Sequence, residues 1–190
     1  MKVVCFGDSN TYGFDPRSYY GGRYGAESRW VDIIASKTGW QINNMGQNGL
    51  AIPDDEYEYR LYDSMLCNKD VNMLIIMLGS NDLLQGLSAK AVSARMNRFL
   101  ARLTIAKDKI LLVCPPAFKN GLWVPDDKTL EHSAHLAEYY RELTSKAGLS
   151  FADASVWGIP LCYDGVHFTE SGHRLFAEKI LEIILNYKEI

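Results

Sequence analysis

The chain has 190 residues, a length that suits one domain with a sizeable core, and we expect residues 1–190 to form a single domain. Hydrophobic residues make up 47% of the sequence, and the formal net charge is -3, with neither sign gathered in a long run. Phosphate binding needs a basic face, so the composition argues against a nucleic-acid partner. No apolar run approaches the roughly 20 residues that span a bilayer, so we expect no membrane partner.

The four cysteines, Cys5, Cys67, Cys114 and Cys162, are widely scattered. No pair has the short spacing of a zinc site or a redox motif. Cys5 and Cys114 lie inside apolar, strand-like runs, where a free thiol behaves as a small hydrophobe. We therefore expect a reduced, cytoplasmic protein without metal or cofactor. A first strand that begins at Lys2 leaves no room for a signal peptide and supports that location.

Five runs of apolar residues predict strands along the chain. In order they are Lys2 to Phe6, Gln41 to Asn44, Val71 to Leu78, Lys109 to Cys114 and Leu149 to Asp153. The third run is the clearest, because its residues from Met73 to Leu78 are apolar on both faces. Such a strand must be covered on both sides, as in a parallel sheet.

Apolar residues recur at helical spacing in the segments between these strands. The expected helices lie around Trp30 to Ile34, Asp54 to Leu66, Val92 to Leu103, Leu136 to Ala147 and Phe176 to Tyr187. Ser88 is a suitable N-cap for the third helix, and Gly148 ends the fourth. Five βα units in a row predict a doubly wound parallel sheet with helices on both faces, because right-handed crossovers pack in that way.

Polar turn residues follow the expected strands. The segments are Gly7-Asp8-Ser9-Asn10 after the first strand, Asn44 to Gly49 after the second, Gly79-Ser80-Asn81-Asp82 after the third, and Asp164-Gly165-Val166-His167 before the last helix. The carboxyl ends of parallel strands meet at one edge of a sheet, where ligands bind. We therefore expect Ser9, Asn81, Asp164 and His167 to lie near one another.

These residue types fit nucleophilic catalysis on an ester. A serine hydroxyl such as that of Ser9 needs a neighbouring base to accept its proton as it attacks a carbonyl, and His167 suits that task. Asp164 would orient the imidazole and stabilise its charged form. The backbone N–H of Ser9, a backbone N–H of the Gly46 to Gly49 loop and the side-chain amide of Asn81 could bind the oxyanion that forms.

The four segments resemble the sequence blocks of the SGNH hydrolases, also called the GDSL esterase and lipase family. They occur in the family's order, and the resemblance covers nearly the whole chain. It implies an α/β fold, a flavodoxin-like three-layer α/β/α sandwich with a five-stranded parallel sheet. It also implies Ser9 as the nucleophile, His167 as the base and Asp164 as the acid. For the oxyanion hole it implies Ser9, Asn81 and Gly49, with Gly46 as a turn residue.

Asn10 departs from the family pattern, which often has leucine there, but it removes no catalytic group. Within the family, the segments Arg29-Trp30, Ile75 to Asp82, Cys114-Pro115-Pro116 and His167 to Glu170 are similar to the arylesterase and acyltransferase branch. This likeness implies a serine esterase that hydrolyses or transfers short-chain acyl groups of small-molecule or sugar esters. A carbohydrate acetyl esterase of the same family would share nearly all of these features.

Two long segments without periodicity, Phe14 to Ser28 and Pro115 to Lys128, carry aromatic residues and follow strand ends. We expect them to form the walls of a substrate pocket, although their aromatic residues could equally form the interface of a homo-oligomer.

A different class of function is a flavodoxin-like binding protein without hydrolase activity, in which the loop Ser9 to Gly13 binds a flavin phosphate. That alternative leaves Asp164 and His167 without a role. His132 and His135 have a spacing found in metal sites but lack a third ligand, so we expect no metal there.

Overall fold

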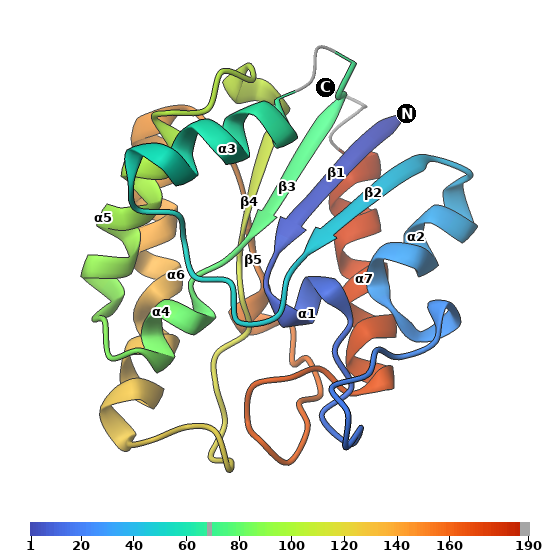
Figure 1. Cartoon of the computed structure of the whole chain (residues 1–190), viewed down its shortest axis with the longest axis vertical. Helices are drawn as coiled ribbons and strands as arrows, with labels where there is room; N and C mark the ends of the chain where they lie inside the picture. Colours follow the sequence, from blue (N-terminus) through green and yellow to red (C-terminus); the bar gives the residue numbers. More distant parts are fainter. Residues whose placement is uncertain (68–69, 187–190) are drawn as a thin grey trace.

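The computed structural model describes residues 1–67 and 70–186. A five-stranded parallel sheet with the strand order β2-β1-β3-β4-β5 lies at its centre (Figure 1). The strands are β1 (Lys2–Gly7), β2 (Gln41–Gly46), β3 (Met73–Met77), β4 (Ile110–Cys114) and β5 (Ser150–Asp153). All five predicted strands are therefore present, in a parallel arrangement as expected.

Helices occupy the segments between the strands. The longer ones are α2 (Trp30–Thr38), α3 (Glu56–Leu66), α5 (Ala89–Leu100), α6 (Asp127–Ala147) and α7 (Glu170–Asn186). Two short helices, α1 (Ser9–Tyr12) and α4 (Ser80–Leu84), directly follow β1 and β3, and 3-10 turns span Ala26–Ser28, Lys107–Lys109 and Ala154–Val156. Tyr187, the expected end of the last helix, lies outside the described residues. Among those residues, no helix is both long and apolar enough to cross a bilayer.

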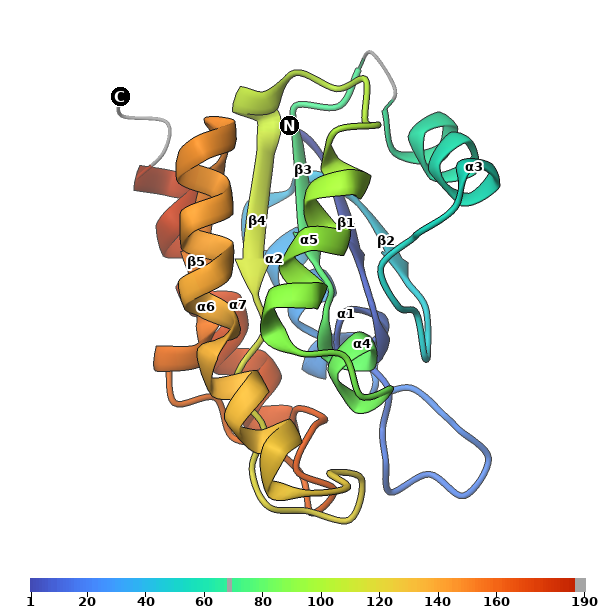
Figure 2. The ribbon, with the colours of Figure 1, turned by 90° about the vertical axis from the view of Figure 1, so that its left-hand side faces the viewer.

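Alternating side chains of the central strands build two cores. In β3, Leu74 and Ile76 pack against the side of the sheet that α3, α5 and α6 cover, whereas Ile75 and Met77 pack against α2 and α7. Figure 2 shows α5 and α6 in front of the sheet, with α7 on its other side. Side chains on the two faces of a strand point in opposite directions, so a strand that is apolar on both faces requires this arrangement. The predicted three-layer α/β/α sandwich is confirmed.

Gly46 corrects one prediction, because it is the last residue of β2, opposite Gly7, and not a turn residue. A Cβ at Gly46 would lie 2.1 Å from the backbone nitrogen of Tyr12. The missing side chain therefore lets α1 pack against the end of β2. The turn comes directly afterwards, where Leu50 N–H donates to the carbonyl of Gln47 at 3.3 Å.

The two short helices were not expected, because the sequence suggested only turns at these points. The side chain of Asp8 caps α1 by accepting the N–H of Asn10 at 2.9 Å. Gly79 precedes α4 with a φ of +123°, a conformation that residues with a side chain rarely adopt. Both helices begin at the carboxyl edge of the sheet (Figure 1). They therefore carry Ser9 and Asn81 to the edge where ligands bind in such folds.

Candidate active site

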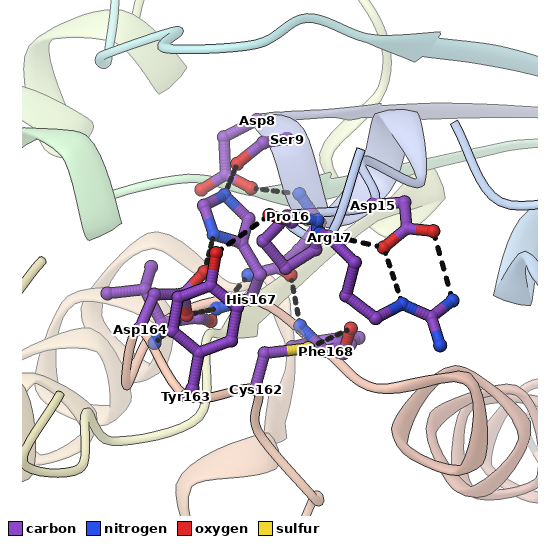
Figure 3. A network of polar contacts seen from close by, with 12 residues as sticks. Asp8, Ser9, Asp15, Pro16, Arg17, Cys162, Tyr163, Asp164, His167 and Phe168 are labelled. Atoms are coloured by element: carbon purple, nitrogen blue, oxygen red, sulfur yellow. Dashed lines mark hydrogen bonds and ion pairs between the residues drawn. The ribbon is translucent and has the colours of Figure 1, made fainter. Parts of the chain in front are cut away.

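The carboxyl edge of the sheet brings Ser9 and His167 together (Figure 3). Ser9 opens α1 directly after β1, and His167 lies in the loop before α7. Although 158 positions separate them in the sequence, Ser9 Oγ lies 2.8 Å from His167 Nε2, within hydrogen-bond distance. Both residues are buried, with 8% and 2% of their surface exposed. The hydroxyl and the imidazole therefore form a polar pair inside the protein.

Asp164 extends this pair into a chain of hydrogen bonds. Its Oδ2 lies 2.8 Å from His167 Nδ1, and its Oδ1 accepts from the backbone N–H groups of Val166 and His167 at 2.9 Å each. Burial opposes ionisation of Asp164, but these hydrogen bonds outweigh it and hold the pKa of the carboxyl below its usual value. An ionised Asp164 accepts a hydrogen bond from the N–H at Nδ1 of His167, and this tautomer leaves Nε2 as an acceptor for the hydroxyl of Ser9.

The turn that carries Asp164 and His167 depends on Gly165. This residue has a φ of +81°, and a Cβ there would lie 2.2 Å from the carbonyl oxygen of Lys119. Lys119 N–H in turn donates to the carbonyl of Gly165 at 3.0 Å. Glycine therefore permits both the turn and its close packing against the segment that follows β4.

Gly49 and Asn81 lie in the walls of the cavity that Ser9 and His167 also line. Gly49 has a φ of +74°, and no atom lies within 4 Å of the position that its Cβ would take. A ligand can therefore approach the backbone of Gly49 closely. The Nδ2 of Asn81 donates one hydrogen bond to the carbonyl of Leu50 at 3.0 Å, which orients the amide and leaves its second N–H for another acceptor.

Asp82 joins the two segments that carry Gly49 and Asn81. Its carboxylate is fully buried, accepts the backbone N–H of Ile52 at 3.0 Å and pairs with Arg95 at 2.8 Å. Burial raises the pKa of the Asp82 carboxyl, although both partners oppose that rise. The carboxylate therefore fixes the turn after β2 against α4.

A cavity of about 290 Å³ opens beside Ser9. It is lined by Ser9, Phe14, Asn48, Gly49, Ser80, Asn81, Leu84, Trp123, Val166 and His167. The rings of Phe14 and Trp123 each lie with their centroids 4.8 Å from that of the His167 ring. These two aromatic residues belong to the two long segments that were expected to form the pocket walls, and they do so here.

Two further contacts hold the segment after α1 against the loop of His167. The hydroxyl of Tyr163 donates to the carbonyl of Pro16 at 2.8 Å (Figure 3). Arg17 pairs with Glu170, the first residue of α7, at 3.0 Å. Asp15, at 2.9 Å, holds the guanidinium of Arg17 in place. Sequence patterns could not indicate the contacts of Tyr163 with Pro16 or of Arg17 with Glu170, because each joins residues that lie far apart in the chain.

His132 and His135, which were weighed as a metal pair, both lie on α6. His135 Nδ1 lies 2.8 Å from the carbonyl oxygen of Glu131 in the same helix. In the described part of the chain, no group of three or more His, Cys, Asp or Glu side chains is placed to hold a metal ion. The polar groups beside the cavity, Ser9, His167 and Asp164, are linked by hydrogen bonds and are of the types used in acid-base catalysis.

The sequence matches the model of the GDSL-like lipase/acylhydrolase family over residues 5–175. No curated protein matches it. Similar solved structures include a protein assigned as an arylesterase from Agrobacterium tumefaciens str. C58, with 27% identity and a TM-score of 0.82 over 98% of this chain and 99% of that chain.

Two further structures show the same fold at lower identity. The aryl esterase of M. smegmatis is 23% identical, with a TM-score of 0.83 over 98% of this chain and 99% of that chain. A carbohydrate acetylesterase family member from Sinorhizobium meliloti is also 23% identical, with a TM-score of 0.83 over 100% of this chain and 99% of that chain. Both therefore resemble this chain along nearly its whole length.

The matched region contains the segments that carry Ser9, Asn81 and His167. It favours an enzyme over the alternative of a flavodoxin-like binding protein without hydrolase activity. The chain belongs to the GDSL-like lipase/acylhydrolase family and is a carboxylic ester hydrolase with the SGNH hydrolase fold.

Proposed function

We propose that the protein is a serine esterase that acts on short-chain acyl esters through Ser9, His167 and Asp164. The observation that carries this proposal is the chain of two 2.8 Å contacts from Ser9 Oγ to His167 Nε2 and from His167 Nδ1 to Asp164 Oδ2. A hydroxyl, a base and an orienting acid in this geometry form the arrangement that serine hydrolases use.

In the first half of the reaction, His167 Nε2 accepts the proton of Ser9 as its oxygen attacks the acyl carbon. Asp164 stabilises the imidazolium that forms and keeps its Nδ1 in place. The imidazolium then donates its proton to the departing alcohol, which leaves the acyl group on Ser9. In the second half, His167 activates water, or a second alcohol in acyl transfer, and the ester to Ser9 is cleaved.

In this proposal, three donors bind the oxyanion of the tetrahedral intermediate. They are the backbone N–H of Ser9, the backbone N–H of Gly49 and the second N–H of the Asn81 amide. Asp82 and the carbonyl of Leu50 hold the last two in position before substrate binds. Preorganised donors of this kind contribute about 2.7–4 kcal/mol each in other serine hydrolases.

The size of the cavity supports short acyl groups. Its volume of about 290 Å³ is at the lower end for ligand sites, and the bulky side chains of Leu84 and Trp123 are among those that line it. A second candidate, a carbohydrate acetyl esterase, is favoured by Trp123, because 48% of its surface is exposed beside the imidazole, where its ring could stack on a sugar. Activity on acetyl to octanoyl esters and on acetylated sugars would distinguish the two.

The location and the assembly of the protein belong to the same proposal. All four cysteines are free, which supports a reducing compartment such as the cytoplasm. The exposed Tyr19 and Tyr20 of the segment after α1 are the residues that self-association through this segment would bury. Light scattering of the purified protein, compared with a Tyr19→Ser/Tyr20→Ser variant, would test for a homo-oligomer.

Replacing Ser9 tests the proposed nucleophile. We expect Ser9→Ala to lower kcat/KM for p-nitrophenyl acetate by about 10³-fold or more, because the acyl group has no oxygen to bind. Ser80→Ala is a matched control, since Ser80 lines the same cavity but is not hydrogen-bonded to His167; its activity should stay within about tenfold of the parent. A Ser9→Ala protein as active as the parent would exclude the proposal.

A further inference from the structure

Asn10, the residue after Ser9 in α1, contacts the loop of His167 with both polar groups of its side chain. Its Nδ2 donates to the carbonyl of Val166 at 3.1 Å, and its Oδ1 accepts the N–H of Phe168 at 2.9 Å. These partners are the residues immediately before and after His167. The side chain is buried, with 3% of the residue exposed. Asn10 therefore holds the main chain on both sides of the imidazole.

We propose that Asn10 is a positioning residue that sets the placement of the base, His167, relative to the nucleophile, Ser9. The inference rests on the proposed function, because it concerns the same two groups. Asn10 and Ser9 are neighbours on one short helix, so the side-chain amide links the main chain of the base to the main chain of the nucleophile. This link persists when the hydrogen bond between Ser9 and His167 breaks during the reaction.

The helix that carries this link is itself held in place. The backbone carbonyl of Asn10 accepts a hydrogen bond from the indole of Trp30 at 3.0 Å, and Trp30, the first residue of α2, is fully buried. At the start of α1, the carboxylate of Asp8 accepts the backbone N–H of Asn10. A positioning group is effective only when its own element is rigid, and these contacts meet that condition.

An apolar side chain could not replace these contacts. Leucine at position 10 would leave the carbonyl of Val166 and the N–H of Phe168 without partners in a buried site. Buried polar groups rarely stay unsatisfied, so the loop would shift until other partners or water were found. A shift of about 1 Å at a reacting group can lower a rate by about 10²-fold.

The decisive experiment is a double-mutant cycle with Asn10→Leu and His167→Ala, read as kcat/KM for p-nitrophenyl acetate. In the parent, Asn10→Leu should lower kcat/KM by about 10²-fold. In the His167→Ala protein, the same change should have an effect of less than about threefold, because the base that Asn10 positions is already gone. If both backgrounds lose the same factor, or if Asn10→Leu leaves the parent within about threefold of its activity, the proposal is wrong.

Asn10→Ser is a second variant for the same cycle, in case Asn10→Leu does not fold. Serine is smaller than asparagine and leaves room for a water molecule, so it should disrupt the buried site less. Asn10→Ser should also lower kcat/KM in the parent and have little effect on kcat/KM in the His167→Ala protein. An active Ser9→Ala protein would overturn the proposed function, whereas an inactive Ser9→Ala protein with a fully active Asn10→Ser protein would overturn only this inference.

Asn44 provides a matched control. Its Nδ2 donates to the carbonyl of Thr11 and its Oδ1 accepts the N–H of Gly46, both at 2.9 Å, so it ties α1 to β2 and not to the loop of His167. Asn44→Ser should lower the Tm about as much as Asn10→Ser but keep kcat/KM within about threefold of the parent. Equal losses of kcat/KM in both variants would assign the effect to a loosened α1 and overturn the proposal.

Discussion

Two buried histidines, His167 before α7 and His173 within it, lie in opposite environments. Both nitrogens of His167 have partners, Ser9 Oγ and Asp164 Oδ2, each at 2.8 Å. Neither nitrogen of His173 has a hydrogen-bond partner among the described residues. Its ring packs instead at steep angles against those of Tyr24 and Phe168, with centroid distances of 5.3 and 5.2 Å.

This difference shows that burial alone does not make an imidazole reactive. Burial, followed by the nearby charges of His167 and Arg29, lowers the pKa of His173 to about 3, so that ring stays neutral. The carboxylate of Asp164 gives His167 what His173 lacks, a negative charge beside Nδ1 that stabilises the protonated ring. His167 is therefore the proposed base, whereas the ring of His173 fills the core.

The largest expected effect tests this division directly. If His167 is the base proposed above, His167→Ala should lower kcat/KM for p-nitrophenyl acetate by about 10³–10⁴-fold, because no other group would accept the proton of Ser9. His173→Leu, which removes an imidazole of similar burial, should change kcat/KM by less than about tenfold. Steady-state kinetics on both folded variants measures this contrast, and comparable losses in the two proteins would break it.

The strands with apolar residues on both faces were the easiest part of the fold to predict. The predicted Lys109 to Cys114 differs from β4 by a single residue at its start, because this strand is buried on both sides and lies between Lys109 and Pro115. The prediction for β3 began too early, at Val71. Asn72 there accepts the backbone N–H of Lys2 with its side chain, and the ladder starts only at Met73.

The short helices and the contacts around the site could not be predicted in the same way. The helices α1 and α4 are too short to show periodicity, and they depend on single features such as the cap at Asp8. The types of the site residues were predictable because few side chains can serve as nucleophile, base or oxyanion donor. Their supports were not, since the link from Asn81 to Leu50 or from Asn10 to Val166 joins a side chain to a distant backbone carbonyl.

Asp8 is an intermediate case between the two histidines, with one oxygen hydrogen-bonded and the other not. Its Oδ1 accepts the N–H of Asn10 at 2.9 Å, whereas Oδ2 has no hydrogen-bond partner among the described residues. Burial raises the pKa of Asp8 to about 6, despite the opposing effects of Asn10, His167 and Ser80. The folded protein therefore keeps this proton up to about pH 6, whereas an unfolded aspartate loses it near 3.8.

We accordingly expect Asp8→Asn to stabilise the protein at neutral pH. Because the folded state binds the proton more tightly, Asp8 lowers the free energy of unfolding as the pH rises from about 4 to 6, by roughly 3 kcal/mol in all. Asparagine keeps the cap on α1 but does not ionise, so the variant should gain stability above pH 6 and none below pH 4. Denaturant unfolding at pH 4 and pH 7.5 measures this difference.

Asp126→Asn is the control for that experiment, because Asp126 also caps a helix, by accepting the N–H of Thr129 at 2.7 Å. Hydrogen bonds from Thr129 lower the pKa of Asp126, so its replacement should bring no gain at neutral pH. A stabilisation of both variants, or of neither, would contradict the assignment of a proton to Asp8.

The smallest expected effect concerns the contribution of His173 to the decrease in the free energy of unfolding at acidic pH. An unfolded histidine takes up a proton below about pH 6.5, whereas His173 in the folded protein stays unprotonated down to about pH 3. The free energy of unfolding therefore falls as the pH drops through this window, and His173 accounts for about 2 kcal/mol of that fall between pH 7 and pH 5. His173→Leu should make the difference in unfolding free energy between these two pH values smaller by that amount.

His135 is exposed, so His135→Gln is the control. The same unfolding measurement on this variant tests whether removing any histidine makes the pH dependence smaller. If denaturant unfolding shows the same dependence on pH for His173→Leu as for the parent, then His173 is protonated in the folded state. Its ring would then need an anionic or hydrogen-bonding partner, and the contrast with His167 would fail. If only His173→Leu flattens the profile, the imidazole of His173 stays neutral in the folded protein because burial without a polar partner disfavours its protonated form.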